Sequence, residues 1–208
     1  METIIFNIDI TGSFVLAVSG ALIAMRSKLD PFGILIVSFI AAVGGGTLRD
    51  VLLSRQVFWL QNNMVVYTVF LGSFIAMVFK DRLRFFDKPM FLYDALGLGL
   101  FTITGVQIGM DHELSIIICV LLGTVTGCFG GVFRDIILNR IPVVFKEEIY
   151  ATASIFGGVL YYILVKFEIQ NPFLQLIPIV TIVTIRLIAV KYNISLPNIY
   201  KNEDTKST

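Results

Sequence analysis

Four ionisable residues could support chemistry in this chain because they lie inside apolar stretches. Arg49 directly precedes Asp50, and Arg134 directly precedes Asp135. Buried charges of this kind usually face a protein interior, an opposite charge or a water-filled cavity. Adjacent residues of a helix point in different directions, so we expect neither arginine to pair with the aspartate beside it. We predict instead that Arg49 pairs with Asp135 and Arg134 with Asp50.

Both pairs belong to a sequence motif that occurs twice and that we call the repeated phrase. Residues 44–60 read GGGTLRDVLLSRQVFWL, and residues 129–145 read FGGVFRDIILNRIPVVF, so that 44 corresponds to 129 at a shift of 85 residues. The same shift relates further polar and glycine residues, namely Asp9 with Asp94, Gly12 with Gly97, Gly20 with Gly105 and Gly72 with Gly157. So many matches at one spacing indicate a duplicated unit.

The repeated aspartates Asp9 and Asp94 allow two interpretations. Acidic side chains at a pore mouth concentrate cations, whereas acidic residues at a helix start are stabilised by the helix dipole. For Asp9 we favour the helix start, near an aqueous end. Asp94 follows Tyr93 within an apolar run, so we group it with the four motif residues as a candidate for pore charge or gating.

The elements that position these residues follow from composition. Of the 208 residues, 56% are hydrophobic and 15% are charged, whereas a soluble domain has about 25% charged residues. The apolar stretches are 6–25, 32–53, 64–79, 90–110, 114–138, 149–166 and 172–190. Most approach the ~20 residues that a helix needs to cross a bilayer. The sequence therefore predicts an all-α polytopic membrane protein with seven transmembrane helices.

Three predicted helices fall in each repeat. The first unit is residues 1–85 and the second is residues 86–170; a seventh helix at 171–191 and a polar C-terminal tail at 192–208 complete the chain. Because three is odd, the second unit starts on the opposite side of the membrane, so we predict two inverted repeats.

Glycines gather where the repeated phrase begins. The first unit has Gly44, Gly45 and Gly46, and the second has Gly127, Gly130 and Gly131. A helix from 32 to 60 would be about 43 Å long, well beyond a ~30 Å hydrocarbon core. We therefore predict a kink or break at each glycine group, lining a pore and freeing backbone carbonyls. Close packing of neighbouring helices is the alternative.

The basic residues favour one orientation. Most follow the first, third and fifth predicted helices or the last one, and they are Arg26, Lys28, Lys80, Arg82, Arg84, Lys88, Arg140, Lys146, Lys191, Lys201 and Lys206. The positive-inside rule places this side in the cytoplasm, with the N-terminus outside and the C-terminus inside. We expect an inner-membrane location, and the basic loops could hold anionic lipid.

Several function classes are not indicated. The sequence has no evident nucleophile–base pair, metal-ligand cluster or phosphate-binding loop, so we predict neither an enzyme nor a cofactor or metal site. A net charge of +1 does not suggest a nucleic-acid partner. Cys119 and Cys128 are predicted to be small buried residues, and Arg186 is predicted to extend to the membrane interface.

GGGTLRDVLL and GGVFRDIILNRIPVVF, one in each half, resemble the signature of the bacterial TRIC family, the prokaryotic relatives of trimeric intracellular cation channels. The resemblance covers about residues 1–190. It implies a homotrimer with one pore per subunit, between helices two and five at their glycine motifs, and passage of monovalent cations, chiefly K⁺. This chain departs from the pattern at Phe129, in place of a glycine, and after the first motif, where no proline corresponds to Pro142 of the second copy.

The leading hypothesis is thus a potassium-permeable channel with K⁺, or else Na⁺, as the permeant ion. Arg49 and Arg134 would tune or gate it, since their charge opposes cation entry. A carrier for glycine or another small zwitterion is the first alternative, because some relatives are described as glycine transporters and an arginine suits a carboxylate. A structural or lipid-organising membrane protein is the second.

Overall fold

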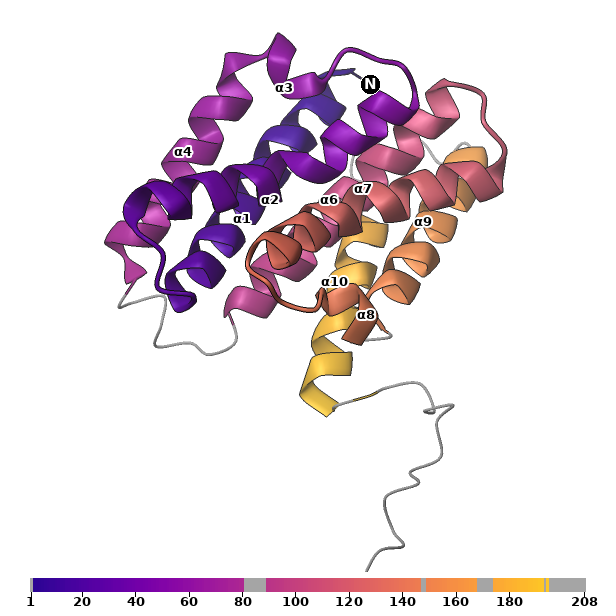
Figure 1. Cartoon of the computed structure of the whole chain (residues 1–208). Coiled ribbons are helices and arrows are strands. Elements are labelled where there is room, and N and C mark those ends of the chain that lie inside the picture. The colour runs from indigo at the N-terminus through magenta and orange to yellow at the C-terminus, as the bar shows by residue number, and fades with distance from the viewer. Residues whose placement is uncertain (1, 81–88, 147–148, 168–173, 193, 195–208) are drawn as a thin grey trace, which may run out of the picture.

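The computed structural model describes residues 2–80, 89–146, 149–167, 174–192 and 194, and the regular structure in these ranges is helical (Figure 1). The helices are α1 (Glu2–Arg26), α2 (Pro31–Leu52), α3 (Phe58–Gln61), α4 (Asn63–Val78), α6 (Pro89–Asp111), α7 (Ile116–Ile137), α8 (Val143–Lys146), α9 (Ala151–Lys166) and α10 (Leu176–Tyr192). Each of the seven predicted apolar stretches overlaps one of the longer helices. The short helices α3 and α8 were not predicted.

Four of the described helices, α1, α2, α6 and α7, are long and apolar enough to cross a membrane. The shorter apolar helices α4 and α9 have 16 residues each, and α10 has 17. The protein is therefore an all-helical polytopic membrane protein, while seven crossings remain a prediction. Large hydrophobic side chains on the outer surface suit a lipid environment; on α4 alone these are Met64, Tyr67, Phe70, Leu71, Phe74 and Val78.

Local sequence explains where α2 begins and where α2 and α7 end. The Asp30 side chain accepts a hydrogen bond from the Gly33 backbone N–H at 2.7 Å, and Pro31 fits the first helical position. Beyond the C-termini, Ser54 and Asn139 each adopt a left-handed backbone with φ of 53°. These two residues are again 85 apart, so the repeated helices terminate in the same way.

The glycine motifs form the contact between α2 and α7. A Cβ on Gly45 would overlap the carbonyl oxygen of Thr126, and a Cβ on Gly130 would overlap that of Ala41. Two backbones can approach this closely only where side chains are absent. Gly45 meets Thr126, whereas Ala41, four residues earlier on α2, meets Gly130, four residues later on α7, so the two helices run antiparallel.

This contact corrects the prediction of helix breaks. Both α2 and α7 are continuous helices through their glycine groups, so the carbonyls there remain in the helical hydrogen-bond ladder instead of facing a pore. The glycines serve the alternative role, close helix packing. Glycine lowers helix propensity by only about 1 kcal/mol per residue, which packing readily offsets.

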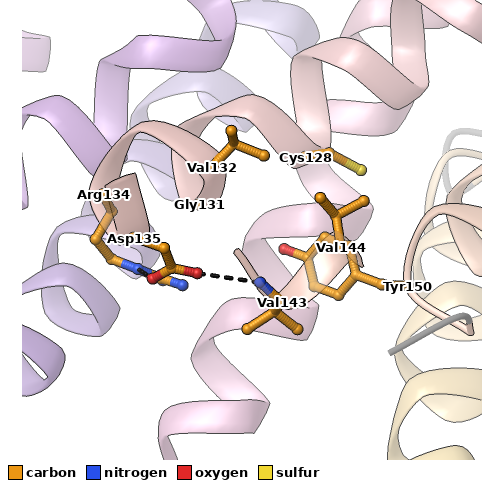
Figure 2. A pocket seen from close by; sticks show the side chains of 8 residues that line it. All are labelled: Cys128, Gly131, Val132, Arg134, Asp135, Val143, Val144 and Tyr150. Atoms are coloured by element: carbon orange, nitrogen blue, oxygen red, sulfur yellow. Dashed lines mark hydrogen bonds and ion pairs between the residues drawn. The ribbon is translucent and has the colours of Figure 1, made fainter. Parts of the chain in front are cut away.

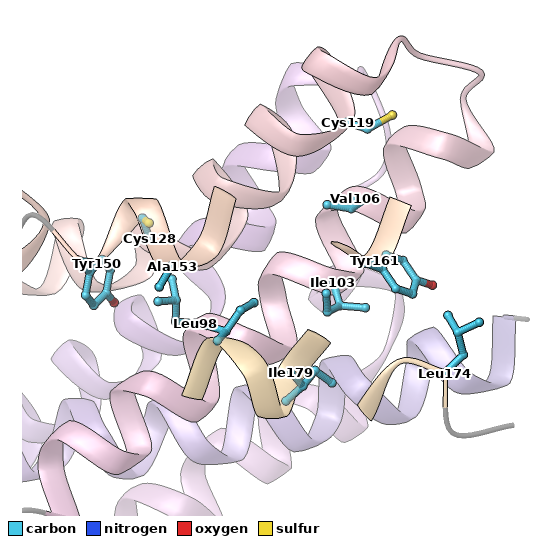
Figure 3. Close-up of a cluster of buried hydrophobic side chains, with 11 residues drawn as sticks. Leu98, Ile103, Val106, Cys119, Cys128, Tyr150, Ala153, Tyr161, Leu174 and Ile179 are labelled. Carbon is cyan, nitrogen blue, oxygen red and sulfur yellow. The ribbon is translucent and has the colours of Figure 1, made fainter. Parts of the chain in front are cut away.

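A large hydrophobic cluster holds the second half of the chain together (Figure 3). It joins α6, α7 and α9 to α10. Its buried members include Leu98, Ile103, Val106, Cys119, Cys128, Tyr150, Ala153, Tyr161, Leu174, Ile179 and Ile182. Both cysteines are buried, as predicted. The additional helix α10 thus packs on the second repeat, where Ile182 lies against Gly157.

Two sets of predictions lie largely outside the described residues. The basic loop with Arg82, Arg84 and Lys88 falls within 81–88, and most of the tail at 192–208 is likewise undescribed. Lipid binding at that loop therefore stays a prediction.

Candidate functional site

Each motif arginine pairs with the aspartate that follows it. Arg49 Nε donates to Asp50 Oδ1 at 2.8 Å, and Arg134 Nε donates to Asp135 Oδ1 at 2.8 Å. The predicted cross-pairs, Arg49 with Asp135 and Arg134 with Asp50, are wrong. Although the two Cβ atoms diverge, the arginine side chain is long enough to fold back along the last helical turn and reach its neighbour.

Each motif aspartate also fixes the short helix that follows it. Asp50 Oδ2 accepts a hydrogen bond from the Phe58 backbone N–H at 2.8 Å. Asp135 Oδ2 accepts one from the Val143 N–H at 3.2 Å, as Figure 2 shows. A carboxylate at a helix start satisfies an otherwise unpaired N–H and is favoured by the helix dipole. This accounts for α3 and α8 at equivalent places.

The repeated aspartates Asp9 and Asp94 approach the same arginines from α1 and α6. Asp94 Oδ1 accepts from Arg134 Nη1 at 2.8 Å, whereas Asp9 Oδ1 lies 3.8 Å from Arg49 Nη1. Asp9 is well inside α1 and only 7% exposed. The preferred interpretation of Asp9 as a helix-start residue at an aqueous end is therefore wrong. We call Asp9, Arg49 and Asp50 the first cluster, and Asp94, Arg134 and Asp135 the second cluster.

Each cluster takes a hydroxyl from the other half of the chain. In the second cluster, Arg134 Nη1 donates to Ser19 Oγ, on α1, at 3.4 Å. Thr104, on α6, lies close to Asp9 in the first cluster, and its Oγ1 donates to the Leu100 carbonyl at 3.1 Å. Ser19 and Thr104 are themselves 85 residues apart. The two halves therefore complete one another's sites.

The clusters lie on opposite sides of the glycine contact. Arg49 follows Gly45 by four residues, and Arg134 follows Gly130 by four. At 1.5 Å per residue each arginine is about 6 Å further along its helix. Because α2 and α7 are antiparallel, these displacements point in opposite directions.

Each cluster holds two carboxylates and one guanidinium. With all groups ionised, each carries a formal charge of −1. The side chains of both arginines are 1% exposed, so the charges act across an interior of low dielectric constant. A cluster of this sign attracts cations, although it contains an arginine. Among the described residues there is no group of three or more His, Cys, Asp or Glu suited to a metal ion.

The surroundings of the two clusters differ. The second borders a narrow pocket that Figure 2 shows, with Cys128, Gly131 and Tyr150 in its lining. The Tyr150 hydroxyl is a hydrogen-bonding neighbour of Asp94, and its ring stacks 4.5 Å from the Arg186 guanidinium. In the first cluster the position equivalent to Tyr150 is Val65, and the Phe58 ring lies 5.5 Å from the guanidinium of Arg49.

The remaining motif glycines also make room for specific neighbours. Gly44 lies against the Phe133 ring and Gly46 against the Phe58 ring. Gly127 faces α6, where a Cβ would meet Thr102 and Leu98. Gly131 is different, because the nearest atom to a Cβ there would be 3.5 Å away.

Ser19, Thr104 and Tyr150 are site residues that the sequence interpretation missed. For Ser19 and Thr104 a signal existed, since both are small hydroxyl residues related by the shift of 85. Tyr150 has an aliphatic counterpart, so the repeat gave no indication. Arg186 was predicted to extend to the interface but is 2% exposed, because Tyr150 and the Ile149 carbonyl provide contacts inside the protein.

Comparison with known proteins agrees with the duplicated pattern. A family model described as "Glycine transporter" matches residues 6–81 and again residues 91–166. The two matched ranges begin 85 residues apart, which is the shift of the repeated phrase. The chain is 34% identical to the inner membrane protein YadS of Escherichia coli K12, covering 97% of this chain and 99% of that one. It is also 34% identical to a membrane protein of Vibrio cholerae, covering 94% and 82%.

The fold matches solved TRIC structures. A structure described in a study of conductance through TRIC cation channels superposes with a TM-score of 0.82 at 28% identity, covering 94% of this chain and 97% of that one. The Rhodobacter sphaeroides TRIC orthologue gives a TM-score of 0.81 at 28% identity, covering 92% and 100%. The solved structures are described as cation channels and the family model as a glycine transporter, which confirms the prediction that the chain is not an enzyme. The chain therefore belongs to the bacterial TRIC family, which the glycine-transporter model also describes.

Proposed function

We propose that the protein is a monovalent cation channel, permeable to K⁺, that works as a homotrimer with one pathway in each subunit. The observation that carries the proposal is the pair of buried clusters, each with two carboxylates for one arginine. A path that passes both clusters would meet negative charge on either side of the glycine contact between α2 and α7. The solved TRIC structures, described as cation channels, support the same conclusion.

The clusters also remove a difficulty of the sequence interpretation. Unpaired arginines would repel cations, but Arg49 and Arg134 are each held by an adjacent carboxylate at 2.8 Å. Because α2 and α7 are unbroken, carboxylate oxygens and hydroxyls would contact the ion, in place of freed carbonyls. The α2–α7 contact is then the constriction, and separation of these helices would open the path.

Reconstitution into planar bilayers tests the proposal. We expect discrete current steps carried by K⁺. Replacing Arg134 with alanine should alter conductance or gating, because it leaves two buried carboxylates uncompensated. Leu60→Ala, at an exposed position outside the clusters, is a matched truncation that should leave the currents unchanged. The absence of current steps from a folded, reconstituted wild-type protein would refute a channel.

A carrier for glycine is the second candidate. The family description favours it, and so does one contact, because Arg49 Nη1 and Asp9 Oδ1 face each other without a hydrogen-bond partner. A guanidinium and a carboxylate side by side match the two charged ends of a zwitterion. Saturable glycine uptake into proteoliposomes, without current steps, would support the carrier and refute the channel.

We further propose an inner-membrane orientation with the N-terminus outside and the C-terminus in the cytoplasm. The basic residues after the first, third and fifth predicted helices support it. In this orientation the first cluster faces the outer side and the second cluster faces the cytoplasm.

A further inference from the structure

The first and second clusters contain the same residue types but differ in how many of their polar atoms have a hydrogen-bond partner. In the second, Asp94 and Arg134 are in direct contact at 2.8 Å. In the first, Asp9 Oδ1 and Arg49 Nη1 are 3.8 Å apart, and neither atom has a hydrogen-bond partner. Both atoms are buried. An unsatisfied buried polar group is costly, so such a pair is suited to hold a small polar or charged ligand.

A third unsatisfied atom lies on the same helix as Asp9. Ser13 is fully buried, and its Oγ has no hydrogen-bond partner. It follows Asp9 by four residues on α1, so the two side chains lie on the same helix face, about 5–6 Å apart at their Cβ atoms. The buried serines Ser38 and Ser73 behave differently, because each donates to a carbonyl of its own helix, at 2.6 Å and 2.8 Å.

The second cluster has no counterpart of this open site. The residue equivalent to Ser13 is Leu98, which is apolar and buried. Tyr150 supplies Asp94 with a hydroxyl neighbour, where the first half has Val65. The difference therefore comes from side-chain identity at two positions, and the repeat itself would have predicted equal sites.

We infer that Asp9 Oδ1 and Ser13 Oγ bind a partly hydrated monovalent cation, and that the first cluster is thus the ion-binding position, whereas the ion pair of the second cluster has a structural role. The inference deepens the proposed channel function and rests on it. The formal charge of −1 and the oxygen ligands both favour a cation. One carboxylate beside a guanidinium provides less negative charge than the several carboxylates of a typical Ca²⁺ site. Water would supply the remaining oxygen ligands, and a water between Asp9 and Arg49 would keep the guanidinium from direct contact with the ion.

Thermal unfolding of the purified protein in detergent tests the site without requiring conduction. At constant ionic strength, replacing N-methylglucamine with K⁺ should raise the melting temperature, by about 5 °C when K⁺ reaches one hundred times its Kd. Asp9→Asn and Ser13→Ala should abolish or greatly reduce this rise. Ser38→Ala is the matched control and should retain it. Asp94→Asn should lower the melting temperature at every K⁺ concentration and still show the rise.

The outcomes separate this inference from the channel proposal. If the wild-type protein conducts K⁺ but melts at the same temperature with and without K⁺, the ion site is overturned. This is the result expected if only a water molecule binds between Asp9 and Arg49. An equal K⁺-dependent rise in wild type and Asp9→Asn also overturns it. A K⁺-dependent rise that Asp9→Asn abolishes, in a protein that carries no current, supports the site and refutes the channel.

Discussion

Two adjacent glycines in the second motif should respond to alanine in opposite ways. At Gly130 a Cβ would overlap the backbone carbonyl oxygen of Ala41, which cannot move without its helix. At Gly131 the nearest atoms would be Tyr150 Oη at 3.5 Å and Arg134 Nη2 at 3.6 Å, which are ordinary contact distances. Both glycines are buried and helical, so helix propensity favours alanine equally at both positions, by about 1 kcal/mol.

The steric cost of the added Cβ decides whether each substitution stabilises or destabilises the protein. To restore an ordinary contact at Gly130, α2 and α7 would have to separate by roughly 1 Å, and overpacking of this kind typically costs about 1–3 kcal/mol or more. After the propensity gain, Gly130→Ala should lose up to about 2 kcal/mol, and Gly131→Ala should gain up to about 1 kcal/mol. For a chain of this size 1 kcal/mol corresponds to about 2–4 °C.

The assay is thermal unfolding in one detergent, followed by circular dichroism and by recovery on size exclusion. We expect Gly130→Ala to melt about 2–8 °C below the wild type and Gly131→Ala at or slightly above it. Gly45→Ala should resemble Gly130→Ala, because it meets the Thr126 carbonyl in the same way. If Gly130→Ala and Gly131→Ala shift in the same direction by similar amounts, the α2–α7 contact does not have the geometry described.

Further predictions concern charge, topology and the lipid face. Asp135→Asn should lower the melting temperature by about 4 °C or more, because Arg134 stays buried with one carboxylate fewer; an unchanged melting temperature would contradict the role of the ion pair. Cysteines placed at the exposed turn residues Ser54 and Asn139 should react with impermeant maleimide from opposite sides of the membrane, and labelling from the same side would refute inversion. Trp59 is the single tryptophan and lines an apolar pocket with Phe39, Val43 and Phe133, so brominated acyl chains should quench its fluorescence more strongly than iodide does.

The long helices could be predicted because their signal is composition over many residues. The shift of 85 also relates charged residues and glycines that lie at equivalent places in α2 and α7. The pairing of Arg49 could not be predicted from Cβ directions, because it depends on how a flexible side chain folds at the end of a helix. The close approach of Gly45 and Gly130 is a tertiary property, and a glycine group alone is equally compatible with a break and with packing.

The structural difference between the two clusters could not be predicted from the repeat pattern either. At the shift of 85, Ser13 corresponds to Leu98 and Val65 corresponds to Tyr150. Without the burial and the hydrogen-bond partners of these residues, such differences look like ordinary divergence. Their meaning follows only from atoms that the structure leaves unsatisfied in one half and satisfied in the other.

The pairing of each arginine with its immediate neighbour has a consequence for biosynthesis. The contact between Arg49 and Asp50 needs no other part of the chain, so it can form as soon as the end of α2 becomes helical. The guanidinium then enters the bilayer already neutralised, before α6 and α7 have been synthesised. An arginine that depended on Asp135 would have to wait in the membrane, at a cost of about 2.5–3.5 kcal/mol at the helix centre, until the second half was inserted.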